Sequence, residues 1–177
     1  MGDSFIAITI FAVFVIGLSS ICYIGYKKSS AKKKEQDSNA ERFGAVMRNT
    51  LKHVDGLPIP KGILIGVYYG PEKFVFTKDN QEFVVAREKI TGVDVVTGKD
   101  LKSQQLGGAA AGKIIFGGMS GAVIGTLIAT TTYLVISYIS DDKTNFIILD
   151  TAASGLFALK VEKDFAKTNT FKRTVEL

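Results

Sequence analysis

The segment ILIGVYYGPEKFVFTKDNQEFVVAREKITGVDVV covers residues 63–96 and carries the clearest β-strand pattern of the chain. It contains four short runs rich in β-branched and aromatic residues, at 63–70, 73–77, 82–86 and 90–96. Gly70-Pro71 and Asp79-Asn80 separate the first three runs, and both dipeptides favour turns. The pattern therefore predicts four β-strands in a meander.

Two further strands and a helix are predicted downstream. TYLVISYI (132–139) and NFIILD (145–150) flank SDDKT, which is typical of a β-hairpin. Beyond them, Phe157, Val161 and Phe165 recur at the i, i+4, i+8 spacing of one helical face. The expected fold class is α+β, a small antiparallel sheet or barrel of about six strands closed by a C-terminal helix.

The order of these segments carries a resemblance. The motifs are GLPIPKG, then EKFVFTKDNQEFVVAREKITGVDV, a glycine-rich insert, YLVISYISDDKTNFIILD and a closing helix. Together, over residues 56–168, they resemble the PH-like (GRAM-like) domains of small, membrane-anchored, largely uncharacterised proteins of Gram-positive bacteria. The resemblance covers about two-thirds of the chain and contains no catalytic motif. It implies a PH-like β domain over 56–177 that acts as a binding or scaffolding module.

PH domains that hold phosphoinositides use several Lys or Arg side chains in and beside their first hairpin. In this chain we take the corresponding turn to be YYGPEKF, which offers Lys73 against Glu72. The resemblance therefore implies no specific inositide binding.

A transmembrane helix is predicted over residues 1–26. Phe5 to Tyr26 contains no charged residue, and 22 helical residues span about 33 Å, enough for a hydrocarbon core of about 30 Å. Asp3 in front of the run and the length of the run both argue against a cleaved signal peptide. We expect one uncleaved span.

A basic cluster follows this span. The cluster consists of Lys27, Lys28, Lys32, Lys33 and Lys34. The positive-inside rule then predicts a single-pass protein of the cell membrane with its N-terminus outside and its C-terminal domain in the cytoplasm. We assign these five lysines to the membrane surface, where anionic lipid headgroups attract them.

The excess of positive charge is local. The formal net charge is +5, and Lys27 to Lys52 alone carries eight Lys or Arg against three Asp or Glu. A nucleic-acid-binding domain is expected to carry its excess on the folded domain. The distribution therefore predicts a membrane partner and no nucleic acid.

Residues 27–55 are predicted to form a solvated basic linker followed by an amphipathic helix. The apolar positions of that helix follow the i, i+3, i+4, i+7 spacing, at Phe43, Val46, Met47, Thr50, Leu51 and Val54. Such a helix either docks on the following domain or lies on the membrane surface.

The glycine-rich insert, residues 103–129, permits several interpretations. Gly107 to Lys113 matches the phosphate-loop pattern G-x-x-x-x-G-K, but Ile114 replaces the hydroxyl residue that would reach Mg²⁺, and the preceding KSQQL is a poor strand. Nucleotide binding is therefore disfavoured. A glycine zipper fits better and predicts self-association through Gly117, Gly121 and Gly125, which recur every four residues, and through a second such pair, Gly108 and Gly112.

Two other interpretations of the insert stay open. The uncharged run from Ile114 to Ile139 is long enough for a second membrane span, although the half after Thr130 is rich in strand-forming residues. A glycine-rich loop between strands is the other. We favour a helical hairpin, cytoplasmic or dipping into the membrane, inserted in the sheet.

The residues that carry catalysis elsewhere are sparse. Cys22 falls in the predicted span, and His53, the sole histidine, falls on the predicted linker helix, where a solvated or lipid-facing role is expected. No nucleophile–base pair and no metal-ligand set is recognisable. We therefore predict a non-enzymatic scaffold without catalytic residues, metal or cofactor, acting as a homo-oligomer or with a membrane protein partner. The alternative is a glycine-zipper oligomer that inserts into or perturbs the membrane.

Overall fold

The computed structural model describes residues 30, 33–105 and 127–172, divided into one compact unit up to Glu41 and a second from Arg42. A helix covers residues 33–43, and Gly44 follows it with a φ of +64°, the left-handed conformation that commonly ends helices. The transmembrane helix predicted over residues 1–26 lies outside the described residues. Within those residues, no helix combines the length and the apolar character needed to cross a bilayer.

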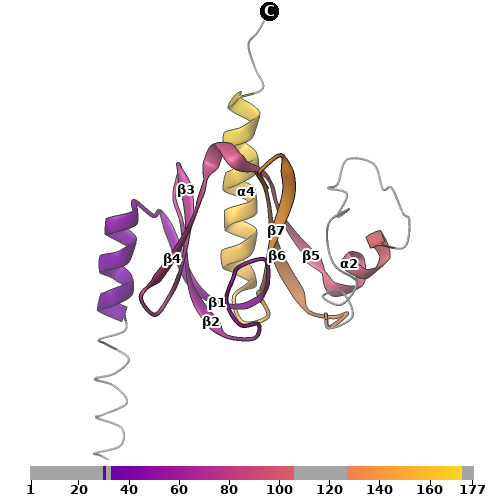
Figure 1. The fold of residues 1–177 in the computed structure, drawn as a ribbon, viewed down its shortest axis with the longest axis horizontal. Coiled ribbons are helices and arrows are strands. Elements are labelled where there is room, and N and C mark those ends of the chain that lie inside the picture. Colours follow the sequence, from indigo (N-terminus) through magenta and orange to yellow (C-terminus); the bar gives the residue numbers. More distant parts are fainter. Residues whose placement is uncertain (1–29, 31–32, 106–126, 173–177) are drawn as a thin grey trace, which may run out of the picture. The chain divides into compact units, whose positions relative to one another are not determined.

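The second unit is built on one seven-stranded sheet in which all neighbouring strands are antiparallel (Figure 1). The strand order is β4-β3-β2-β1-β7-β6-β5. The strands are β1 (Met47–Asp55), β2 (Leu64–Tyr69), β3 (Lys73–Lys78), β4 (Gln81–Ala86), β5 (Ile90–Thr97), β6 (Thr132–Ser140) and β7 (Lys143–Asp150). The expected α+β class is confirmed, and all six predicted strands are present.

The predicted four-stranded meander is wrong in its last step. Strands β2, β3 and β4 pair in sequence, but β5 pairs with β6 at the opposite edge of the sheet. Between β4 and β5 the chain passes through a short 3₁₀ helix, η1 (Arg87–Lys89). This connection lacks the Gly, Pro, Asn or Asp that a tight hairpin turn requires, so the chain leaves the edge of the sheet.

The β6–β7 hairpin forms as predicted. Ser140 pairs with Lys143, which leaves Asp141 and Asp142 as the two turn residues. Their φ angles are +53° and +57°. A two-residue turn with both φ angles positive matches the right-handed twist of the strands, and Asp tolerates that conformation.

The amphipathic helix predicted over residues 43–54 is wrong, because Met47–Asp55 forms strand β1. The misleading residues are Met47 and Leu51, whose spacing of four is a full helical turn but also an even number of strand residues. The burial of Val46 and His53 distinguishes the two periods. The predicted helix would bury Val46 and expose His53, whereas Val46 is 65% exposed and His53 is buried. The segment expected to be a solvated linker contains the helix at residues 33–43 instead.

One face of the sheet, here called the inner face, packs on the C-terminal helix α4 (Gly155–Lys172), so that prediction is confirmed. All seven strands contribute to this core, and Figure 1 shows strands of the two halves of the sheet on either side of α4. The helix contributes Phe157, Ala158, Val161 and Phe165, which are buried at the helical spacing. Burial of this continuous apolar surface is the main stabilising contribution to the domain.

The opposite, outer face carries a second cluster over β5, β6 and β7. It joins the strand residues Val96, Tyr133, Val135, Phe146 and Ile148 to Leu101 of helix α2 (Gly98–Gln105) and to Leu127. Strand β6 is therefore buried on both faces. A second membrane span over Ile114–Ile139 is accordingly wrong, because residues 132–140 lie inside the sheet.

Candidate functional site

The residues proposed as functional from sequence fall largely outside the described part of the chain. Among the membrane-surface lysines, Lys33 and Lys34 are exposed on the helix at residues 33–43. Lys27, Lys28 and Lys32 lie outside the described residues. So do the glycines proposed for self-association, Gly108, Gly112, Gly117, Gly121 and Gly125.

The structure does describe how the glycine-rich insert joins the sheet. The backbone N–H of Gly98 donates to the carbonyl of Thr131 at 2.9 Å, and the N–H of Lys99 donates to the carbonyl of Ala129 at 3.1 Å. A Cβ at Gly98 would lie 2.1 Å from the carbonyl oxygen of Ile128, so only glycine fits this approach. The chain therefore leaves the sheet and returns to it at one place, here called the neck (residues 98–101 and 127–131).

Two side chains hold the neck on the outer face. The Tyr133 hydroxyl accepts a hydrogen bond from the N–H of Ile128 at 2.9 Å. The Thr97 hydroxyl accepts one from the N–H of Asp100 at 3.1 Å and donates to the Asp100 carboxylate at 2.7 Å. This reciprocal pair caps the first turn of α2. Leu101, 1% exposed, then anchors the helix in the outer cluster.

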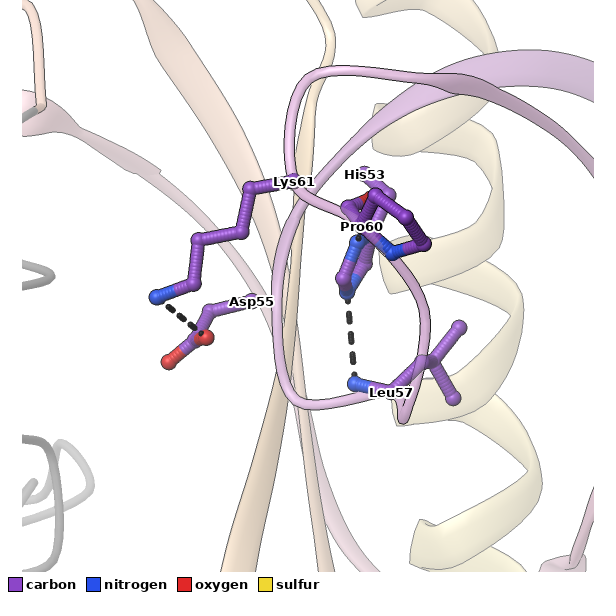
Figure 2. Close-up of polar contacts among 5 residues, drawn as sticks. All are labelled: His53, Asp55, Leu57, Pro60 and Lys61. Atoms are coloured by element: carbon purple, nitrogen blue, oxygen red, sulfur yellow. Dashed lines mark hydrogen bonds and ion pairs between the residues drawn. The ribbon is translucent and has the colours of Figure 1, made fainter.

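His53 occupies the first hairpin and differs from its expected role. The prediction of a solvated or lipid-facing histidine is wrong, since the side chain is 1% exposed. Figure 2 shows the ring held within its own hairpin loop, with Nε2 accepting from the N–H of Leu57 at 3.2 Å and Nδ1 lying 3.1 Å from the carbonyl of Pro60. These partners require a neutral ring with its proton on Nδ1. The imidazole thus serves as an internal brace of the loop.

The loop around His53 joins β1 to β2, so the first hairpin is not the YYGPEKF turn, which joins β2 to β3. Lys61 forms an ion pair with Asp55 at 2.8 Å, drawn in Figure 2. A Cβ at Gly56 would lie 1.9 Å from the Phe146 carbonyl oxygen, so the loop backbone lies directly on β7. The loop is thus fastened to the sheet, and its lysine is already paired with a carboxylate.

A buried polar network connects η1, β2 and α4. Arg87 Nη1 donates to the Tyr69 hydroxyl at 2.9 Å, and that hydroxyl donates to Asp164 Oδ2 at 2.7 Å. Arg87 Nη2 donates to the Phe165 carbonyl at 3.1 Å, and the guanidinium lies 3.8 Å from the Phe165 ring centroid. Burial, assisted by the bond to Asp164, raises the pKa of Tyr69 above its usual value of 10.0.

This network and a second carboxylate of α4 act as structural ties. Glu162 Oε1 accepts a hydrogen bond from the N–H of Val95 at 2.9 Å, so the helix also closes part of the free edge of β5. The polar groups of the network form hydrogen bonds that fix α4 to the sheet. The network thus sets the orientation of α4 and offers no exposed nucleophile or base.

Sequence reasoning missed this network because its partners are far apart in the chain. Tyr69 and Asp164 are separated by 95 positions, and Arg87 and Phe165 by 78. No local spacing signals such pairs. The one available signal was an arginine at the junction of two predicted strands, where a buried charge requires partners from elsewhere.

In the parts of the chain that the structure describes, no group of three or more His, Cys, Asp or Glu side chains is placed to hold a metal ion. Comparison of the chain with models of protein families and with curated proteins finds no match.

Proposed function

We propose that this protein is a membrane-anchored, non-enzymatic scaffold that presents a PH-like domain on the cytoplasmic side of the cell membrane and associates with its own copies. The observation that carries the proposal is the neck, which holds both ends of a glycine-rich apolar insert on one face of an otherwise self-contained domain. Such an insert adds a contact surface without contributing to the inner core.

The PH-like assignment is supported by the architecture. The resemblance leads us to expect an antiparallel sheet closed by a C-terminal helix, and the seven-stranded antiparallel sheet packs on α4. The assignment as a non-enzymatic binding module is supported by His53, Arg87 and Tyr69. Their polar atoms form hydrogen bonds within the fold. Groups consumed in this way stabilise a framework rather than act on a substrate.

Self-association is supported by the composition of the insert and by the position of its ends. Small residues at every fourth position allow helix backbones to approach closely. Since both ends of the insert are tied at the neck, the segment returns to the side from which it leaves. The same observation favours the alternative function, in which the insert dips into the bilayer and perturbs it.

The membrane topology is tested with single cysteines in intact cells. In a Cys22→Ser background, Thr91→Cys places a thiol at an exposed position of β5. The proposal predicts no reaction with a membrane-impermeant maleimide in intact cells, full reaction after lysis, and retention of the chain in membranes after alkaline extraction. Labelling of intact cells would place the domain outside and end this proposal.

Self-association is tested by crosslinking in membranes. Gly121→Leu adds bulk to the proposed zipper face, whereas Ser120→Leu places the same leucine side chain one residue away. We expect Gly121→Leu to abolish the crosslinked oligomer and Ser120→Leu to retain most of it. Equal crosslinking of wild type and both variants would contradict a zipper. Membrane leakage caused by the wild type and lost in Gly121→Leu would favour the alternative, an oligomer that perturbs the membrane.

A further inference from the structure

The outward surface of helix α4 carries exposed leucines and lysines that do not pack on the sheet. Five exposed residues form a narrow stripe, here called the α4 stripe: Leu156, Leu159, Lys160, Lys163 and Lys167. At 100° per residue they fall within about 100° of the helical wheel. The residues that pack on the sheet occupy the opposite side of the wheel, so the stripe points away from the core.

The charge of the stripe follows from where the acidic residues of the helix point. Glu162 accepts a hydrogen bond from the Val95 N–H, and Asp164 accepts one from the Tyr69 hydroxyl. Both carboxylates are therefore directed toward the sheet and away from the three lysines. Since the lysines face outward without an acidic residue of α4 among them, they present a one-signed positive surface about 10 Å long.

The apolar part of the stripe is also exposed. Leu156 and Leu159 are 77% and 51% exposed, and they lie one helical turn apart at the N-terminal end of α4. Isolated exposed leucines are common, but two that adjoin three lysines on one helix face form a combined apolar and cationic surface. A partner must therefore offer negative charge together with an apolar layer.

We propose that the α4 stripe docks on the surface of an anionic lipid bilayer, with the lysines at the headgroup phosphates and the two leucines at the upper edge of the acyl chains. A bilayer supplies both layers at the required depth, which is how amphipathic helices with lysine-rich faces bind membranes. The proposal rests on the proposed membrane location and names the face of the domain that meets the lipid. It does not depend on self-association.

The test uses the full chain with Cys22→Ser, reconstituted in vesicles with or without phosphatidylglycerol in phosphatidylcholine. An environment-sensitive fluorophore is attached at Leu159→Cys, or at Val84→Cys as a control that is 58% exposed on β4. Docking predicts a blue-shifted emission, quenched by nitroxide lipids, for Leu159→Cys only. The signal should require phosphatidylglycerol and weaken at high salt.

Charge reversal supplies the matched comparison. Lys160→Glu/Lys163→Glu/Lys167→Glu should lower the ratio of docked to undocked chain by about a hundredfold, since each of the three lysines near an anionic surface contributes about 1 kcal/mol. Lys52→Glu/Lys89→Glu/Lys143→Glu makes the same charge change at exposed positions outside α4 and the neck and should leave the ratio unchanged. Unaltered thermal unfolding of both triple variants shows that folding is intact.

Three results would overturn the proposal: equal quenching with and without phosphatidylglycerol, equal effects of the two triple variants, or a blue shift that rises with protein concentration in lipid-free detergent. The last would assign the stripe to a second copy of the chain. A chain removed from the vesicles by alkaline washing contradicts the proposed anchoring instead. The released chain is then tested for flotation with the vesicles. Loss of flotation in the triple variant of α4 alone supports docking of the α4 stripe, whereas a wild-type chain that does not float overturns it.

Discussion

The two faces of the sheet are covered in different ways. The inner face collects apolar side chains from all seven strands and is closed by α4. Over β5, β6 and β7 the outer face is covered by α2 and Leu127, the two ends of the glycine-rich insert. The inner core is therefore the framework of the domain, whereas the outer cluster holds the ends of the insert on the sheet.

The largest effect is expected from a change in the inner core. Phe165→Ala removes a buried ring that packs on the core and lies under the Arg87 guanidinium. We expect a loss of about 3 to 5 kcal/mol in the free energy of unfolding, measured by urea denaturation. Leu156→Ala, on the exposed side of the same helix, should stay within about 0.5 kcal/mol of wild type. Similar losses for the two variants would contradict the assignment of the faces.

The attachment of the insert to the outer face is disrupted most directly by a substitution in the neck. Gly98→Ala places a Cβ against the Ile128 carbonyl, which should cost about 1 to 3 kcal/mol because the backbone must shift. Gly155→Ala is the matched control, since a Cβ there meets nothing within 4 Å. Thermal unfolding of the two variants gives the difference. A Gly98→Ala protein as stable as the control would show that the neck is not closely packed.

The network between the sheet and α4 predicts a pH-dependent effect. Tyr69→Phe removes the hydroxyl that links Arg87 to Asp164, and we expect a loss of about 1 to 2 kcal/mol at neutral pH. Because folding raises the pKa of Tyr69, its contribution is fully present below pH 10.0, the usual value, and is lost as the pH rises through the folded-state pKa.

The measurement for Tyr69 is the unfolding free energy between neutral pH and the alkaline range. The wild type should lose stability above pH 10.0, and Tyr69→Phe should lose less over the same range. Tyr138→Phe serves as a comparison, because burial also raises the pKa of that hydroxyl. Parallel pH profiles for wild type and Tyr69→Phe would contradict the network as a source of stability.

The smallest effect is expected at the cap of α2. Thr97→Ala removes the acceptor for the N–H of Asp100 and should cost about 1 kcal/mol. Thr97→Ser retains the hydroxyl and should stay near wild type. Amide hydrogen exchange in α2 provides the measurement, with faster exchange expected in Thr97→Ala while β2 and β3 keep their protection. Uniform loss of protection would show that α2 is part of the inner framework.

The difference between the faces also explains what the sequence predicts well. Strands β2 to β4 and the β6–β7 hairpin are set by local features, such as the β-branched and aromatic run around Val67 and the turn at Asp141 and Asp142. The C-terminal helix follows from the spacing of Phe157, Val161 and Phe165. These signals are short-range, so one sequence is enough to identify them.

The errors arise where distant segments decide the structure. Strand β6 is buried on both faces and therefore reads as an uninterrupted apolar run, which merges with the insert to imitate a membrane span. The sequence predicts a helix in place of strand β1 because the spacing of Met47 and Leu51 fits both periods. The polar ties of His53 and Arg87 depend on chain segments brought together only by the fold.

If the insert mediates association and the inner core does not need it, a chain without the insert should fold but no longer associate. Residues 107–125 are replaced by a short Gly-Ser linker in the full chain, which is then crosslinked in membranes, with thermal unfolding as the control for folding. We expect a cooperative unfolding transition close to that of wild type and no crosslinked oligomer. An oligomer of undiminished yield, or a chain that no longer unfolds cooperatively, would contradict it.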